Sequence, residues 1–283
     1  MNMKKIGIVG AGTMGNGITQ AFAVAGFDVV MSDVAEAALQ RGLATLSSSL
    51  DRLVKKDKMT EAQKAEAIAR VSGSTELGAM SDCDLIIEAA TENLALKLKI
   101  FEQLDAIAKP EAIIASNTSS ISITKLAAST RRAERIIGMH FFNPVPVMAL
   151  VELIRGLQTS DATYAAVETL ARAVGKTPVQ VRNSPGFVVN RLLCPMINEA
   201  IFALGEGLAS AAEIDEAMKL GCNHPIGPLA LGDMIGLDVE LAVMQVLFEG
   251  FKDPKYRPAP LLVEMVEAGY LGRKSGKGFF EYK

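Results

Sequence analysis

Cysteine, histidine and tryptophan are scarce in this 283-residue sequence, and neither sign of charge dominates. Its three cysteines are widely spaced, odd in number and form no C-x-x-C pair, so neither a disulfide framework nor a zinc site is expected. We expect them to be small buried side chains in a reducing compartment, and we expect no metal. A net charge of −3 provides no field for nucleic acid, and no apolar run reaches the roughly 18 residues of a membrane span. Nucleic-acid-binding and membrane-spanning proteins are therefore excluded.

The first residues share some features with a secretory signal peptide. Lys4 and Lys5 precede an apolar stretch, and Ala21-Phe22-Ala23 resembles a cleavage site. Cleavage there would remove the glycine turn described next, and the many glycines before it make a poor continuous apolar segment. We therefore expect a cytoplasmic protein.

A glycine-rich turn after an apolar run is the most informative pattern present. Apolar residues 6–9 predict a strand, and the small residues 16–25 predict a helix. Between them, Gly10 permits a tight turn, Gly12 lets a phosphate approach the backbone, and Gly15 lets the helix pack closely on the strand. A glycine turn alone can be only a turn, but this order of elements favours a dinucleotide site.

Asp33 strengthens the prediction and selects the cofactor. It ends a second apolar run, residues 27–32, about 20 residues beyond the glycines, where an acid binds the ribose of a dinucleotide. A carboxylate accepts hydrogen bonds from a ribose 2′-hydroxyl, but it repels a 2′-phosphate by ~4 kcal/mol per charge pair at about 4 Å and an effective dielectric near 20. No Arg or Lys follows Asp33 before Arg41, so NAD is favoured over NADP.

Strand and helix patterns alternate over the first two thirds of the chain, which predicts an α/β fold with a Rossmann-type, mostly parallel sheet. We expect a dinucleotide-binding domain over residues 1–184, with a helical insertion at about 35–70 that turns near residues 58–60. Further strands are expected at 84–88, 112–116, 135–139 and 149–153, and further helices at 94–107 and 161–174. The sheet domain is expected to end after residues 178–182.

An all-helical C-terminal domain, residues 185–283, is predicted beyond the turn-forming cluster 183–186. Ser210 and Glu213 form a plausible capping box for one of its helices. The first helix is apolar on most sides, which favours a homodimer formed through this domain, although a well-packed monomer remains open. The helices are expected at 188–208, 211–220, 229–250 and 260–269.

His140 and His224 are the only histidines, and so the only side chains whose ordinary pKa is near neutrality. His140 follows the expected strand 135–139, at the sheet edge where ligands of open α/β sheets bind. Oxidation of an alcohol by NAD needs a base for the hydroxyl proton, and a carboxylate that orients the imidazole improves it. Glu152, on the expected returning strand, is a candidate for that carboxylate. We interpret His224, in a loop between helices, as structural.

Two polar residues and a basic cluster complete the candidates. Ser119 follows the expected strand 112–116 and would lie at the same edge as His140, unless it caps a helix. Asn190 would lie near the start of the first C-terminal helix, unless it is an ordinary buried polar residue. Arg52 and Lys56 belong to a positive cluster in the helical insertion, which can equally be a solvated helix face.

Four motifs make the chain resemble the L-3-hydroxyacyl-CoA dehydrogenases over essentially its whole length. The resemblance implies reversible hydride transfer between NAD(H) and C3 of a short-chain (S)-3-hydroxyacyl-CoA, with 3-hydroxybutyryl-CoA as the expected substrate. The alternatives are a dehydrogenase of a free β-hydroxy acid and a non-catalytic NADH-binding protein of the same fold. The motifs are residues 10–15, 115–120, 138–146 and 185–191.

The resemblance also implies roles for individual residues. His140 becomes the acid/base and Glu152 its orienting carboxylate, while Ser119 and Asn190 position the substrate. Lys56 and Arg52 become partners of the coenzyme A phosphates. Glu92 and Lys97 are assigned to the nicotinamide side of the cofactor site. The full set of candidate cofactor-binding residues is Gly10, Gly12, Thr13, Met14, Gly15, Asp33, Glu92, Lys97 and Asn117.

Overall fold

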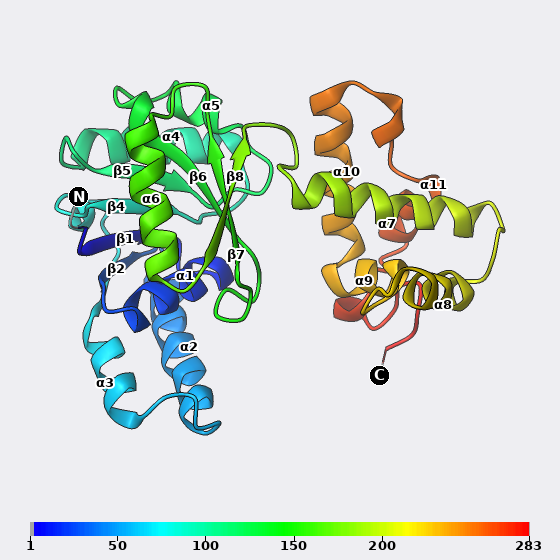
Figure 1. Cartoon of the computed structure of the whole chain (residues 1–283), viewed down its shortest axis with the longest axis horizontal. Coiled ribbons are helices and arrows are strands. Elements are labelled where there is room, and N and C mark those ends of the chain that lie inside the picture. The colour runs from blue at the N-terminus through cyan, green and yellow to red at the C-terminus, as the bar shows by residue number, and fades with distance from the viewer. Residues whose placement is uncertain (1–2, 283) are drawn as a thin grey trace. The chain divides into compact units, whose positions relative to one another are not determined.

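The computed structural model describes residues 3–282, and the chain divides into two compact units on either side of the Asn183–Ser184 bond. Each unit has a different architecture, as Figure 1 shows: a sheet covered by helices in the first, and helices in the second.

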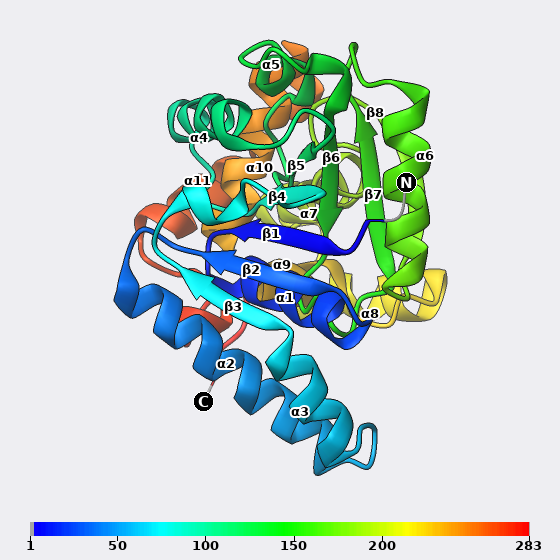
Figure 2. The ribbon, with the colours of Figure 1, turned by 90° about the vertical axis from the view of Figure 1, so that its left-hand side faces the viewer.

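The first unit is built on one eight-stranded sheet. Its strands are β1 (Lys5–Val9), β2 (Asp28–Ser32), β3 (Val71–Ser74), β4 (Leu85–Glu88), β5 (Ile113–Ser116), β6 (Ile136–Phe141), β7 (Leu150–Arg155) and β8 (Thr177–Arg182). They lie in the order β3-β2-β1-β4-β5-β6-β7-β8, which can be followed in Figure 2 from one edge to the other. Every neighbouring pair is parallel except β6 and β7. The predicted mostly parallel sheet is therefore confirmed.

Helices pack on this sheet because each carries an apolar stripe. One face is covered by α1 and α6, where Phe22 and Val167 join Ile87 and Met139 of the strands in a single buried cluster. The predicted insertion is a pair of helices, α2 and α3, which Figure 1 shows side by side. The helices of this unit are α1 (Thr13–Val24), α2 (Glu36–Val54), α3 (Glu61–Ala69), α4 (Leu94–Ile107), α5 (Ile123–Ala127) and α6 (Asp161–Ala173), with short 3-10 turns at Leu77–Met80 and Ala133–Arg135.

Two strand predictions need correction. The edge strand β3 was not predicted, because its four residues, Val71–Ser74, are mostly polar and only partly covered. The strand expected to end before His140 continues through Phe141, because its last residues pair with β7 in the antiparallel register. His140 therefore lies within β6 rather than just past it.

The second unit is helical and has its own core, which includes Ile197, Ile201, Leu229 and Leu262. The capping box of Ser210 and Glu213 is present at the start of α8. Its helices are α7 (Val189–Gly205), α8 (Ala211–Cys222), α9 (Pro228–Ile235), α10 (Leu237–Phe251) and α11 (Pro260–Glu267), with short 3-10 turns at Pro254–Tyr256 and Arg273–Ser275.

Two predictions for the second unit were wrong. The single helix expected at 229–250 is two helices, because Gly236 adopts a φ of 105° that is incompatible with a continuous helix. Cys222 is exposed, whereas Cys83 and Cys194 are buried as expected. Within residues 3–282, no helix is long and apolar enough to cross a membrane.

Candidate active site

The glycine turn lies between the carboxyl end of β1 and the start of α1. Gly10 has a φ of 104°, and a Cβ on it would lie 2.7 Å from the carbonyl oxygen of Ala89. A Cβ on Gly15 would lie 1.8 Å from the carbonyl oxygen of Gly10. Gly12 differs, because a Cβ there would meet no atom within 4 Å, and no side chain caps the helix. The start of α1 therefore has open space beside Gly12 and no side-chain cap on its first N–H groups, an arrangement that fits an anionic phosphate.

A pocket of about 440 Å³ begins at this turn. Asp33 lies on its wall, and the carboxylate is held by two backbone groups: Oδ2 accepts from Ala11 N at 3.0 Å and Oδ1 from Ala35 N at 3.1 Å. Gly10 and Gly12 line the pocket, whereas Thr13, Met14 and Gly15 belong to the first turn of α1. The pocket is lined by Val9, Gly10, Gly12, Ser32, Asp33, Val34, Leu77, Ala89, Ala90, Thr91, Leu96, Lys99, Ile100 and Gln103.

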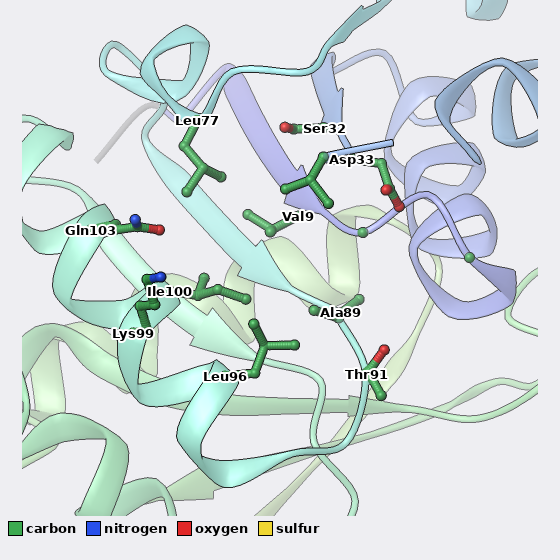
Figure 3. Close-up of a pocket in the computed structure, with 14 residues that line it drawn as sticks. Val9, Ser32, Asp33, Leu77, Ala89, Thr91, Leu96, Lys99, Ile100 and Gln103 are labelled. Carbon is green, nitrogen blue, oxygen red and sulfur yellow. The ribbon is translucent and has the colours of Figure 1, made fainter. Parts of the chain in front are cut away.

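Helix α4 supplies the far wall of the pocket and with it a cation that the sequence analysis missed. Figure 3 shows Lys99 and Gln103 coming from α4, across the pocket from Asp33. Lys99 is far from Asp33 in the sequence, and the residues that directly follow Asp33 contain no Arg or Lys before Arg41. Lys99 lies on the same pocket as Asp33 because β4, the strand before α4, pairs with β1. The sequence can reveal this cation only once α4 has been placed in the fold.

A buried ion pair lies at the carboxyl end of β4. The ammonium of Lys97 donates to Glu88 Oε1 at 2.5 Å and to the carbonyl oxygen of Ala90 at 3.1 Å, and both charged side chains are buried. Ser116 Oγ donates to the other Glu88 oxygen at 2.7 Å. The sequence analysis missed Glu88, although an acid at the end of an otherwise apolar strand was a signal.

Glu92 connects Lys97 to the segment that carries Ser119. Its Oε2 lies 3.4 Å from Lys97 Nζ, and its Oε1 accepts from Thr118 Oγ1, Ser119 N and Ser120 Oγ at 2.5, 3.1 and 2.7 Å. Burial alone would raise the pKa of Glu92, but the charge of Lys97 and the hydroxyl donors outweigh it and lower this pKa. Glu92 is therefore ionised at neutral pH and fixes the Ser119 segment.

His140 and Glu152 face each other across β6 and β7. The strand register pairs the two residues directly, and His140 Nδ1 lies 2.7 Å from Glu152 Oε2. The exposed fractions are 7% for His140 and 0% for Glu152. The centroid of the Phe142 ring lies 4.5 Å from that of the imidazole. With Nδ1 directed at the carboxylate, Nε2 is the nitrogen of the ring that can exchange a proton with a substrate.

Asn117 links β4 and β6 by hydrogen bonds at this edge of the sheet. Its side-chain oxygen accepts from Phe141 N at 2.9 Å, and its backbone N–H donates to the Glu88 carbonyl at 2.7 Å. The cap of α5 is Ser122, so the interpretation of Ser119 as a helix cap is wrong. The first unit thus brings Glu92, Lys97, Asn117, Ser119, His140 and Glu152 to the carboxyl ends of β4, β5 and β6 and to the strand beside them.

The remaining candidates lie elsewhere. Arg52 and Lys56 are exposed near the C-terminal end of α2. This 19-residue helix is about 28 Å long, and its other end is the one that follows Asp33 in the sequence. Asn190 lies in the first turn of α7, in the second unit. His224 lies between α8 and α9, and no group of side chains able to hold a metal ion occurs in the described part of the chain.

These features define an α/β oxidoreductase that binds a dinucleotide at the carboxyl edge of its sheet. Residues 5–184 match the family model described as 3-hydroxyacyl-CoA dehydrogenase, NAD binding domain, and residues 186–282 match the C-terminal domain of the same family. The chain belongs to the 3-hydroxyacyl-CoA dehydrogenase family, so the resemblance found in the sequence is confirmed. Its cofactor is NAD.

Several relatives match over nearly their whole length. The 3-hydroxybutyryl-CoA dehydrogenase of Bradyrhizobium diazoefficiens is 54% identical over 281 residues, 99% of this chain and 96% of that protein. That of Clostridioides difficile is 52% identical over 278 residues, 98% of this chain and 99% of that protein. The crystal structure of (S)-3-hydroxybutyryl-CoA dehydrogenase PaaH1 from Ralstonia eutropha is 68% identical, with a TM-score of 0.98 and full coverage of both chains.

Proposed function

We propose that the protein catalyses the reversible, NAD-dependent oxidation of a short-chain (S)-3-hydroxyacyl-CoA at C3, with 3-hydroxybutyryl-CoA and acetoacetyl-CoA as the substrate pair. The observation that carries the proposal is the 2.7 Å contact of His140 with Glu152, at the sheet edge that also holds the dinucleotide turn. The names of the three relatives described above agree with it.

His140 is the acid/base of the proposed reaction. In the reduction it gives the Nε2 proton to the oxygen at C3, and in the oxidation it removes that proton from the hydroxyl. Glu152 holds the ring in one tautomer and stabilises the imidazolium. Acid/base catalysis of this kind accelerates a reaction by about 10²–10⁴-fold, which corresponds to an activation free energy lower by ~3–5.5 kcal/mol.

The residues around the glycine turn fit the cofactor. The open N-terminus of α1 at Gly12 would hold the pyrophosphate, and Asp33 would accept hydrogen bonds from the adenosine ribose. Glu92 and Lys97 follow β4, on the side of β1 where His140 lies, and would face the nicotinamide end of the cofactor. When bound, NADH supplies the hydride.

Ser119 and Asn190 are the proposed substrate-positioning residues. The backbone N–H of Ser119 is anchored by Glu92, which leaves its hydroxyl in a fixed segment at the edge that holds His140. Lys56 and Arg52 are the proposed partners of the coenzyme A phosphates, because both are exposed cations that a phosphate can approach.

The second unit is the proposed dimerisation surface. Leu192 of α7, Met234 of α9 and Phe248 of α10 are large apolar side chains with 69%, 49% and 40% of their surface exposed, and burial in a homodimer would remove that surface from water. A cytoplasmic location stays a prediction from the sequence.

Initial rates with 3-ketoacyl-CoAs of increasing chain length, each with NADH and with NADPH, test the proposal. We expect turnover of acetoacetyl-CoA with NADH and competitive inhibition by free coenzyme A. Turnover of a free β-keto acid without inhibition by coenzyme A would favour the free-acid alternative. NADH binding without turnover of any of these substrates would favour a non-catalytic protein.

A further inference from the structure

The loop that joins β6 to β7, residues 142–149, connects the two strands of the proposed acid/base pair. β6 carries His140 and β7 carries Glu152, and the first residue of the loop, Phe142, places its ring 4.5 Å from the imidazole. The position of the loop therefore affects the surroundings of His140.

This loop has few backbone donors of its own. Pro144 and Pro146 have no N–H, and the N–H groups of Val147 and Met148 both donate to the Pro144 carbonyl. The carbonyl oxygens of Val145 and Met148 accept instead from a side chain, the ammonium of Lys176, at 2.5 and 2.8 Å.

Lys176 is unusual because it is a buried cation held by carbonyl groups. Only 8% of its surface is exposed, and within residues 3–282 it forms no ion pair with a carboxylate. Burial lowers the pKa of Lys176. A buried ammonium is costly unless its protons are bonded, and removing it would leave two loop carbonyls unpaired.

The opposite side of the loop rests on the helix of the glycine turn. Val145 is buried, and a Cβ on Gly17 of α1 would lie 2.8 Å from Val145 Cβ. The next residue after Lys176, Thr177, donates its N–H to the Ala149 carbonyl at 2.8 Å. The loop is therefore held between α1 and the start of β8, with Lys176 making the polar contacts.

We propose that Lys176 is a positioning residue for the reaction: its ammonium fixes the 142–149 loop, and the fixed loop holds Phe142 against His140 and keeps the His140–Glu152 contact in place. This inference rests on the proposed acid/base role of His140. Lys176 acts through the loop and takes no part in proton transfer.

The test compares Lys176→Met and Lys176→Arg with a matched control, Lys109→Met, in the full chain. Lys109 also bonds to a carbonyl, that of Asp82 at 3.0 Å, and to Asp84 Oδ1 at 2.5 Å, but it does so before the start of β4, at the opposite end of the strands from His140. Methionine matches the side chain as far as Cε and removes its donors, whereas arginine restores donors. Thermal unfolding of each variant sets a temperature at which all are folded.

At that temperature we expect Lys176→Met to lower kcat for acetoacetyl-CoA about tenfold while the KM for NADH changes less than about twofold. Lys176→Arg should recover part of this loss. Lys109→Met should lose stability but keep kcat. An unchanged kcat in Lys176→Met, an equal loss in Lys109→Met, or no recovery with arginine would overturn the proposal.

A second readout does not depend on turnover. The chain has two histidines, so the Nδ1 proton of His140 can be assigned by NMR with a His224→Gln variant. Its signal should move or broaden in Lys176→Met and stay in place in Lys109→Met; an unmoved signal in both would overturn the proposal. Wild-type protein that fails to reduce acetoacetyl-CoA would refute the proposed function, and the NMR comparison would still test the effect of Lys176 on His140.

Discussion

Buried charged side chains have different roles in the two units. In the first, Lys97 bonds to Glu88, and His140 contacts Glu152, so titratable groups face each other at the sheet edge where ligands bind. In the second, buried carboxylates accept backbone N–H groups. Asp233, for example, accepts from Phe279 and Phe280 at 3.0 Å each. The first unit therefore places two buried pairs at the edge of its sheet that holds the candidate active site, whereas Asp233 of the second unit joins separate segments of the chain.

Glu240 does not fit either role. It is buried in α10 of the second unit, and neither carboxylate oxygen has a hydrogen-bond partner in the described part of the chain. Burial raises the pKa of Glu240 to about 8, and the weakly polar thiol of Cys194 beside it offsets this only in part. A buried carboxyl without strong donors lowers stability when it ionises. The comparison therefore predicts opposite effects for removing an acid in the two units.

The largest expected effect is at the site itself. His140→Gln should lower kcat by about 10²–10⁴-fold, because the variant cannot exchange a proton with the oxygen at C3. Its affinity for NADH, measured by fluorescence titration, should stay close to that of the wild type. A near-normal kcat would remove His140 from the mechanism.

Breaking the buried Glu88–Lys97 pair of the first unit should lower the free energy of unfolding. Glu88→Ala leaves the ammonium of Lys97 buried without its main partner, and we expect the free energy of unfolding to fall by about 3–5 kcal/mol. Glu102→Ala, at an exposed position of the same helix as Lys97, is the control for a carboxylate lost from the surface. Similar stabilities of the two variants in urea would contradict the role given to Glu88.

Removing the isolated acid of the second unit should do the reverse, in a pH-dependent way. The ordinary pKa of the carboxyl is 4.5, so between pH 4.5 and about 8 the folded chain keeps a proton that the unfolded chain has lost, and the free energy of unfolding falls as pH rises. Glu240→Met should lack this loss, and its stability relative to wild type should grow by about 3–4 kcal/mol between pH 5 and pH 9.

Urea unfolding at several pH values measures this difference. Glu216→Met, which removes an exposed carboxylate of α8, is a matched control and should shift stability by less than about 1 kcal/mol. A stability difference between Glu240→Met and wild type that does not change with pH would show that Glu240 is not a buried titrating group.

The smallest expected effect concerns cofactor choice. Asp33→Ala removes hydrogen-bond acceptors for the ribose and also a repulsive charge for a 2′-phosphate, so NADH binding should weaken by about 1–2 kcal/mol while NADPH binding weakens less. Lys99, on the facing wall of the pocket, would favour the phosphate further once Asp33 is gone. Equal losses for NADH and NADPH would count against the role of Asp33.

Local patterns predicted most of the fold. Apolar runs located every strand of the sheet except the edge strands β3 and β8, and the glycine turn with Asp33 located the pocket. The returning strand was predicted well enough to pair His140 with Glu152, twelve residues apart. These features could be predicted because each depends on neighbours in the sequence or on one strand pairing.

The rest depends on contacts that a single sequence does not encode locally. Lys176 reaches a carbonyl 31 residues away, and Lys99 joins the pocket only through the strand order. The break at Gly236 was missed because a glycine inside an apolar helical pattern is often tolerated. The His140–Glu152 pair was found because His140 stands in a recognisable motif and Glu152 on the next predicted strand, whereas Glu88 and Lys176 act from positions that look like ordinary strand ends.

The most direct test of the central claim is a double-mutant cycle of His140→Gln and Glu152→Gln, measured as the rate of NADH oxidation with acetoacetyl-CoA. If Glu152 acts through the imidazole, Glu152→Gln should slow the reaction strongly when His140 is present and add almost nothing once His140 is glutamine. Equal losses from Glu152→Gln in both backgrounds would contradict the proposed acid/base pair.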